Sequence, residues 1–142
     1  SKIKENSLEF NQNIFFDGQI YDAYSFVNDL IKVAKSEIVL IDNYIDDTVF
    51  TLFSKFPNIN FTIYTSTISK QLSLDFEKYS KQYRNISLKT FKSSHDRFLI
   101  IDKKEIYHLG ASLKDLGKKW FAFSKMSLNS LNLDEILYKL EV

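Results

Sequence analysis

The hydrophobic positions of this 142-residue chain follow two spacings, one typical of helices and one typical of strands. Apolar side chains that recur every three or four residues predict helices over residues 21–35, 48–55, 69–83 and 133–140. Short β-branched or aromatic runs predict strands over residues 14–16, 37–42, 60–64, 86–91, 97–101, 106–109 and 119–123. In the first helix, we expect the buried stripe to consist of Tyr21, Tyr24, Val27, Ile31 and Ala34, broadened by Phe26 and Leu30.

The order of these elements predicts the fold class. Strands and helices alternate in the first half of the chain, whereas the second half is mostly consecutive strands. This order predicts an α/β fold in which a mixed β-sheet is flanked by helices. Residues 1–13 are polar and aperiodic, which indicates a tail or linker before one domain over residues 14–142. The pair Asp17-Gly18 predicts a turn after the first strand.

Composition and charge exclude several classes of protein. The chain has 19 Lys and Arg against 18 Asp and Glu, so nucleic acid would have to bind through a local patch rather than a basic field. No cysteine is present, which excludes disulfides and thiolate metal sites. No apolar run reaches the ~20 residues of a membrane span, so we expect a cytoplasmic protein without membrane contact. Because the chain does not begin with Met, we expect it to be a domain of a longer protein.

The candidate chemistry lies around the strand predicted over residues 97–101. His95 precedes this strand, Arg97 begins it and Asp102 follows it. Alternate residues of a strand share a face, so we expect His95 and Arg97 to point to the same side. Imidazole can attack phosphorus or transfer protons near neutral pH, and guanidinium can hold two phosphoryl oxygens. Ser112, one connection later, could donate to a further phosphoryl oxygen.

At these residues the chain resembles the phospholipase D superfamily. The family signature is His-x-Lys, four residues and Asp, followed by a Gly-Ser-x-Asn segment. His95, Arg97 and Asp102 follow the first part with one substitution, and Gly110-Ala111-Ser112 stands near the second. The strand, helix and strand predicted upstream are similar to the start of a phospholipase D-like half, so the resemblance covers residues 14 to about 125. The chain is also similar to bacterial domains that follow phage-antirepressor-type DNA-binding domains.

The resemblance implies a metal-independent phosphodiesterase or nuclease that needs no cofactor. One histidine forms a phosphohistidine, a second protonates the leaving oxygen, and water completes the hydrolysis. Since the chain holds one motif, this mechanism implies a homodimer with two His95 side chains across a two-fold axis. The implied catalytic residues are His95, Arg97 and Asp102, with Asp102 in a structural or orienting role. The implied phosphate- and substrate-binding residues are Ser112, Lys114, Asp42 and Tyr44, and the implied substrate is a nucleic-acid phosphodiester.

Departures from the family pattern leave an alternative open. Arg97 replaces lysine, Ala111 or Ser112 stands where serine is expected, and Lys114 or Asp115 lies near the position of the family's asparagine. The alternative is a catalytically inactive module of the same fold that binds or dimerises and regulates an attached DNA-binding domain.

Two further clusters have competing interpretations. Asp42, Asp46 and Asp47 could bind a divalent cation, or Asp46 or Asp47 could cap the helix that follows, and capping is favoured. A second cluster interleaves lysines with aromatic residues, and it could bind nucleic acid or form an edge strand with core aromatics. Its members are Lys114, Lys118, Lys119, Lys125, Trp120, Phe121 and Phe123. Alternation favours a core position for Phe121 and Phe123. His108 is expected to be an ordinary, partly buried strand residue.

Overall fold

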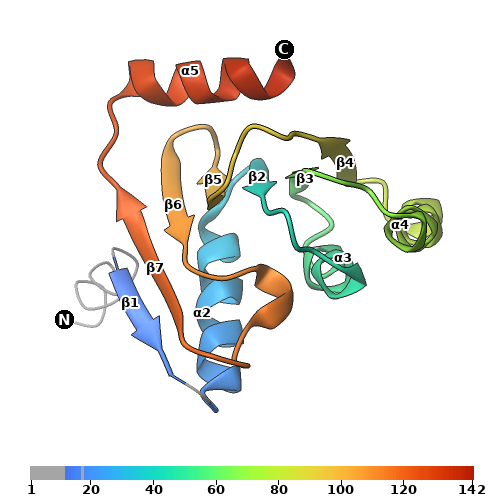
Figure 1. Ribbon diagram of the computed structural model, residues 1–142, viewed down its shortest axis with the longest axis horizontal. Coiled ribbons are helices and arrows are strands. Elements are labelled where there is room, and N and C mark those ends of the chain that lie inside the picture. Colours follow the sequence, from blue (N-terminus) through green and yellow to red (C-terminus); the bar gives the residue numbers. More distant parts are fainter. Residues whose placement is uncertain (1–11, 17) are drawn as a thin grey trace.

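A computed structural model describes residues 12–16 and 18–142 (Figure 1). Strands occupy β1 (Gln12–Phe15), β2 (Glu37–Ile41), β3 (Asn60–Thr65), β4 (Ile86–Thr90), β5 (Arg97–Ile101), β6 (Glu105–Leu109) and β7 (Phe121–Met126). The helices are α2 (Ile20–Val33), α3 (Asp47–Ser54), α4 (Lys70–Gln82), α5 (Ser130–Glu141) and the short 3-10 turn η1 (Leu113–Asp115). Most of the expected tail, residues 1–11, and Asp17 of the expected turn lie outside the described residues, and β1 begins two positions earlier than the sequence predicts.

The seven strands form one mixed sheet in the order β1-β7-β6-β5-β2-β3-β4. Strands β2, β3 and β4 are parallel, and the helices α3 and α4 make the long crossovers that parallel pairing requires. From β2 outward through β5, β6, β7 and β1, each pair is antiparallel. The predicted α/β fold with a mixed sheet flanked by helices is therefore confirmed.

Helices cover the two faces of the sheet unequally. Side chains of α2, α3 and α4 form the larger core with one face of the sheet, and α5 packs on the other face (Figure 1). Strand β2 serves both cores, because Ile38 and Leu40 point to the first and Val39 and Ile41 to the second. The second core reaches from α5 to β2, β3, β5 and β6, but its fully buried members include no residue of β1 or β7.

The apolar stripe of α2 differs from the sequence prediction. Its buried residues are Ala23, Phe26, Val27, Leu30 and Ile31, which lie at the i, i+3, i+4, i+7, i+8 positions of one face. Tyr21 is 82% exposed, so its assignment to the stripe is wrong. The reason is rotational: Tyr21 precedes Ala23 by two residues, which turns it about 200° around the helix axis.

Gly117 fixes the path of the chain before β7. Its φ is +79°, and a Cβ added there would lie 2.4 Å from the Cα of Ile20. Only glycine allows this backbone angle together with this close approach. The loop between η1 and β7 is thereby held against the first turn of α2. No helix within the described residues is long and apolar enough to cross a lipid bilayer.

Candidate phosphate-binding site

Arg97, Asp42 and Ser112 lie where three strands end or begin at one edge of the sheet. Ile41 pairs with Phe98, and Arg97 pairs with Leu109. This register places Asp42, which follows β2, beside Arg97, which begins β5. The chain that leaves β6 after Leu109 continues through Gly110 to Ser112 at the same edge.

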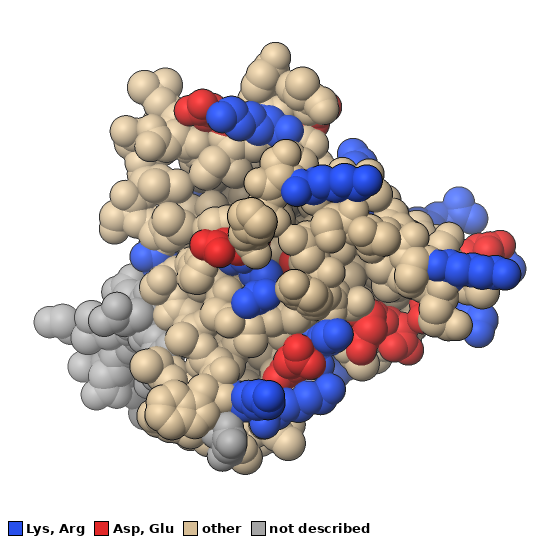
Figure 2. Space-filling view, viewed as in Figure 1, with Lys and Arg blue, Asp and Glu red and all other residues tan. Residues whose placement is uncertain are grey.

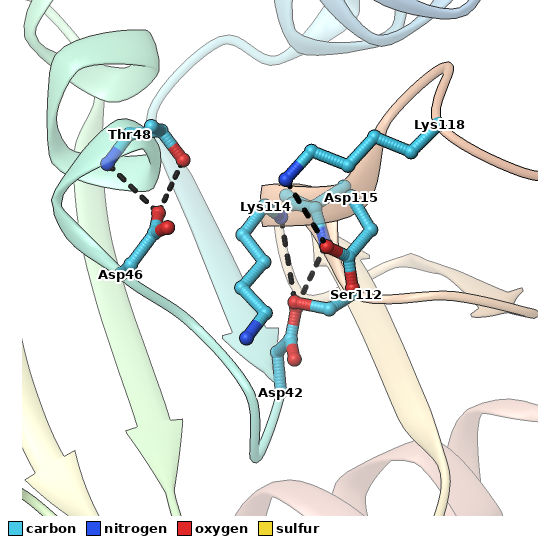
Figure 3. Close-up of polar contacts among 8 residues, drawn as sticks. Asp42, Asp46, Thr48, Ser112, Lys114, Asp115 and Lys118 are labelled. Atoms are coloured by element: carbon cyan, nitrogen blue, oxygen red, sulfur yellow. Dashed lines mark hydrogen bonds and ion pairs between the residues drawn. The ribbon is translucent and has the colours of Figure 1, made fainter.

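Asp42 is fully buried and joins two of these segments. One carboxylate oxygen accepts hydrogen bonds from the Ser112 hydroxyl and the Leu113 amide, each at 2.9 Å, and the other accepts from the Tyr44 amide at 3.1 Å. Burial raises the pKa of Asp42, although these three donors and the nearby positive charge of Arg97 oppose the rise. Asp42 therefore fixes the turn after β6 to the end of β2 (Figure 3).

Ser112 is 3% exposed and already has a partner for its hydroxyl proton. Its oxygen also accepts weakly, at 3.4 Å, from the amide of Lys114 at the start of η1. To donate to a phosphoryl oxygen, the Ser112 hydroxyl would have to leave Asp42. In Figure 3 the half-buried Lys114 side chain runs on the same side as the Asp42–Ser112 contact.

Arg97 keeps most of its donors uncommitted. One guanidinium nitrogen, Nη2, donates to the Gly110 carbonyl at 3.0 Å, and the guanidinium carbon lies 5.9 Å from the centroid of the exposed Tyr44 ring. Among the residues that the structure describes, the buried Arg97 Nε has no hydrogen-bond partner. A buried donor without an acceptor is costly, and an oxyanion that drew the guanidinium toward it could satisfy it.

His95 is exposed in the bend before β5, and Asn43 holds that bend. The Asn43 side-chain amide donates to the Ser94 carbonyl at 2.8 Å, while its oxygen accepts from the Ser66 amide at 3.0 Å. Asn43 thus joins the histidine segment to the end of β3. The sequence analysis did not assign this role, and the available signal was an asparagine directly after a buried strand.

Asp102 lies at the opposite end of β5. Five residue steps separate it from Arg97, roughly 17 Å along an extended strand. Its carboxylate accepts from the backbone amides of Lys35, Ser36 and Glu37 at 2.8–3.0 Å and from the Ser36 hydroxyl at 3.1 Å. Desolvation opposes ionisation, but the amides of Glu37, Lys35 and Ser36 and this hydroxyl outweigh it and lower the pKa of Asp102 to about 2. The structure therefore does not bring Asp102 together with His95.

The acidic corner after β2 is arranged for capping. Asp46 is the N-cap of α3, and its side chain accepts from the Thr48 amide at 3.0 Å (Figure 3). The capping interpretation is confirmed for Asp46. Across residues 12–16 and 18–142, no group of three His, Cys, Asp or Glu side chains is placed to hold a metal ion.

The lysine and aromatic cluster separates into two parts. Phe121 and Phe123 are buried in the larger core, as alternation predicted, whereas Trp120 is 66% exposed. Lys118 pairs with Asp115 and Lys125 with Glu105, at 3.6 Å and 3.5 Å. Figure 2 shows acidic and basic side chains interspersed over the face in view, without a continuous basic field.

His108 is a half-buried strand residue, as expected, and it has a partner that the sequence analysis missed. Its Nε2 lies 3.2 Å from a carboxylate oxygen of Asp96, the residue between His95 and Arg97. Its ring meets the edge of Phe98 with a centroid distance of 5.5 Å. Asp96 and His108 thereby lie next to the site on the same sheet face as α5, at a part of that face that α5 does not cover.

Comparison with known proteins supports the fold. No protein-family model matches the chain, and a search of curated proteins finds no relative. Among solved structures, NucT from Helicobacter pylori is similar with a TM-score of 0.62 and 16% identity, over 94% of this chain and 95% of that one. The archaeal chromatin protein TrmBL2, described as showing a novel mode of DNA binding, has a TM-score of 0.57 and 15% identity over 99% of this chain. Polyphosphate kinase from Porphyromonas gingivalis has a TM-score of 0.57 and 13% identity over 92% of this chain.

The shares of the matched proteins differ. This chain spans 58% of the TrmBL2 chain and 22% of the kinase chain, so in both cases it corresponds to part of a longer protein. NucT, by contrast, matches over nearly its whole length. The mixed sheet, the edge where β2 and β5 meet and the likeness to NucT together show that this chain has a phospholipase D-like α/β fold.

Proposed function

We propose that this chain is a metal-independent phosphodiesterase of the nuclease-like kind, which acts on nucleic acid as a homodimer through His95. The observation that supports it best is an exposed histidine two residues before Arg97, at a strand end that hydrogen bonds of Asp42 and Asn43 hold together. The likeness to NucT suggests a nuclease-like form of this fold.

In the proposed reaction a His95 imidazole nitrogen attacks phosphorus and the bond to one ester oxygen breaks. A second imidazole donates a proton to that oxygen as it leaves. In this proposal Arg97 stabilises the charge that builds on the phosphoryl oxygens, and Lys114 assists. Water then attacks the phosphohistidine, the second imidazole takes up the water's proton, and His95 is released with a phosphomonoester as product.

The second imidazole would come from a second copy of the chain. His108 contacts Asp96, and its side chain points to the opposite face of the sheet from that of Arg97. It is therefore a poor source of that proton. A two-fold axis that passes near His95 would bring two equivalent imidazoles to one phosphate. Exposure of His95 in the single chain is compatible with such a site.

Hydrolysis of bis(p-nitrophenyl) phosphate in EDTA tests the proposal. The wild-type chain should be active, and His95→Ala should lose on the order of 10³-fold or more in kcat/KM because the nucleophile is gone. His108→Ala, which removes the chain's other histidine, is the matched control and should remain active. Sedimentation equilibrium should show a dimer. Equal activity of the wild type and His95→Ala would exclude the catalytic assignment.

A second candidate is a non-catalytic module attached to a DNA-binding regulator, such as an antirepressor-type domain. Two observations favour it: the Ser112 hydroxyl is committed to Asp42, and this chain corresponds to 58% of TrmBL2, a protein described as binding DNA. This candidate predicts a dimer without hydrolysis of any phosphodiester. Wild-type activity that depends on His95 would exclude it.

A further inference from the structure

A groove of about 660 Å³ lies beside the proposed phosphate site on the sheet face that α5 leaves uncovered. It runs over β6, β7 and β1, and its lining includes Phe16, His108, Gly110, Ala122 and Ser124. One histidine and one serine among apolar and backbone surfaces are typical of a ligand groove with a few orienting polar groups. The catalytic proposal makes no use of this groove.

The groove adjoins the proposed phosphate site at the end of β6. Gly110 lines the groove, and its carbonyl accepts the hydrogen bond from Arg97. His108 lines it too and contacts Asp96, the immediate neighbour of both His95 and Arg97. Because alternation places the Arg97 side chain on the opposite sheet face from the groove, a ligand whose phosphate meets Arg97 would reach the groove by passing over the ends of β5 and β6 at Gly110.

An exposed aromatic pair stands at one end of the groove. Phe16, at the end of β1, meets Trp120 edge to face with ring centroids 4.7 Å apart, and both rings are about half exposed or more. Such edge-to-face contact orients both rings and leaves an indole surface free for another aromatic ring. Lys118 and Lys119, both exposed, precede Trp120 in the loop that Gly117 holds in place.

The separation of Trp120 from Arg97 suits the nucleotides next to a scissile phosphate. Arg97 pairs with Leu109, which pairs with Phe123, so two strand spacings lie between β5 and β7. Trp120 precedes Phe123 by three residues along the direction of β7. The Cα atoms of Arg97 and Trp120 are therefore roughly 14 Å apart.

We propose that this groove binds the unpaired bases of a single-stranded nucleic acid, with one base stacked on Trp120, while a backbone phosphate lies at Arg97. The inference rests on the proposed function for the position of that phosphate. Single strands are favoured because stacking on a protein ring requires a base that is free of its own partner. Stacking on aromatic side chains beside basic residues is how single strands bind without sequence preference.

Trp120 is the chain's single tryptophan and contacts Phe16 of the groove lining, so its fluorescence reports on this aromatic pair. The His95→Ala protein, which cannot cut the strand, is titrated with oligothymidylate, with an abasic deoxyribose-phosphate oligomer of equal length and with a DNA duplex. Oligothymidylate should quench the Trp120 fluorescence strongly. The abasic oligomer and the duplex should reduce the fluorescence intensity only slightly. Equal changes with all three ligands, or binding without quenching, would overturn the proposal.

Affinity measured by anisotropy of a labelled oligonucleotide gives a second readout. Trp120→Ala should weaken binding of oligothymidylate about 10-fold and leave binding of the abasic oligomer unchanged. Leu131→Ala, which removes another exposed apolar side chain from the remote helix α5, is the matched control and should change neither. If the oligonucleotide does not bind, or if Trp120→Ala breaks a dimer instead, the groove is not a base site.

The two proposals can fail separately. Hydrolysis of bis(p-nitrophenyl) phosphate, which is too small to reach Trp120 from Arg97, should be the same for the wild type and Trp120→Ala. Absence of this hydrolysis together with base-dependent quenching would reject the catalytic proposal and keep the base site. His95-dependent hydrolysis without base-dependent quenching would do the reverse.

Discussion

The two ends of β5 carry parts of one motif but differ in how their side chains are satisfied. At the Asp102 end, one carboxylate accepts four hydrogen bonds from the segment that joins α2 to β2. At the His95 end, the histidine is exposed, and within the described residues Arg97 makes one hydrogen bond, to Gly110. A side chain with all its bonds made within the chain contributes to stability, whereas one with free donors or acceptors is available to a ligand. The difference supports a structural role for the Asp102 end and agrees with the binding role that we propose for the His95 end.

The largest effect that we expect from testing this contrast is the loss of activity in Arg97→Ala. Hydrolysis of bis(p-nitrophenyl) phosphate should fall by about 10²- to 10³-fold in kcat/KM, because the charge on the phosphoryl oxygens loses its donors. Stability in urea should fall by only about 1 kcal/mol, for the single bond to Gly110. Arg97→Lys is the control: it keeps the charge without the planar fork and should recover part of the activity. Full activity in Arg97→Ala would remove the binding role from this end of β5.

Asp102→Ala should give the opposite result. Three backbone amides would lose their acceptor, and alanine would have to adopt the positive φ of 52° at this position, so the free energy of unfolding should drop by about 3 kcal/mol. Asp102→Asn keeps an acceptor oxygen and tolerates this φ, and it should lose less. Activity per folded molecule should be unchanged in Asp102→Asn. A selective loss of kcat without loss of stability would place Asp102 in the chemistry after all.

Acid should weaken the Asp102 end in a defined pH window. The pKa of Asp102 is lowered from its ordinary value of 3.8 to about 2, so the ionised form is the one that the fold stabilises. The contribution is present above about pH 4 and is lost as pH falls through about 2, and solvent screening of this accessible carboxylate keeps it smaller than the shift alone would imply. Urea denaturation of the wild type and Asp102→Asn between pH 2 and 5 checks this: the stability difference should shrink toward the acid end. A constant difference would show that the charge is not what the amides bind.

The sequence predicted the elements that repeat a local pattern. The strand over residues 97–101 was confirmed without change, and alternation placed Phe121 and Phe123 correctly in the core. The start of β7 was placed two residues early because Trp120, a residue with high strand propensity, extends the apolar run although the backbone there is a loop. The position of the Trp120 ring depends on its contact with Phe16, which lies more than a hundred residues earlier in the chain. A local sequence pattern contains no information about such a contact.

The sequence indicated which residue types form the candidate site, but it did not predict the hydrogen bonds that join these residues to distant segments. The motif and Asp42 were singled out, and the structure brings Asp42, Arg97 and Ser112 to one edge. The partners of Asp102 lie 65 to 67 residues away, and Asn43 spans 51 residues to Ser94. Such bonds depend on strand register, which hydrophobic spacing leaves undetermined between distant strands. Strand register therefore determines that the Asp102 carboxylate has its hydrogen bonds made within the chain, whereas Arg97 keeps donors for a ligand.

The smallest expected effect concerns the ion pair at the open end of β5. Asp96 and His108 approach to 3.2 Å, but their side chains are 64% and 38% exposed, so water and salt screen the contact. Asp96→Asn should therefore cost less than about 1 kcal/mol in urea denaturation, and a double-mutant cycle with His108→Gln isolates the pair from other effects. A coupling well above this value would mean that the His95 segment is already held firmly in the free protein. The two ends of β5 would then differ in the chemistry of their side chains, but both would contribute to the stability of the fold.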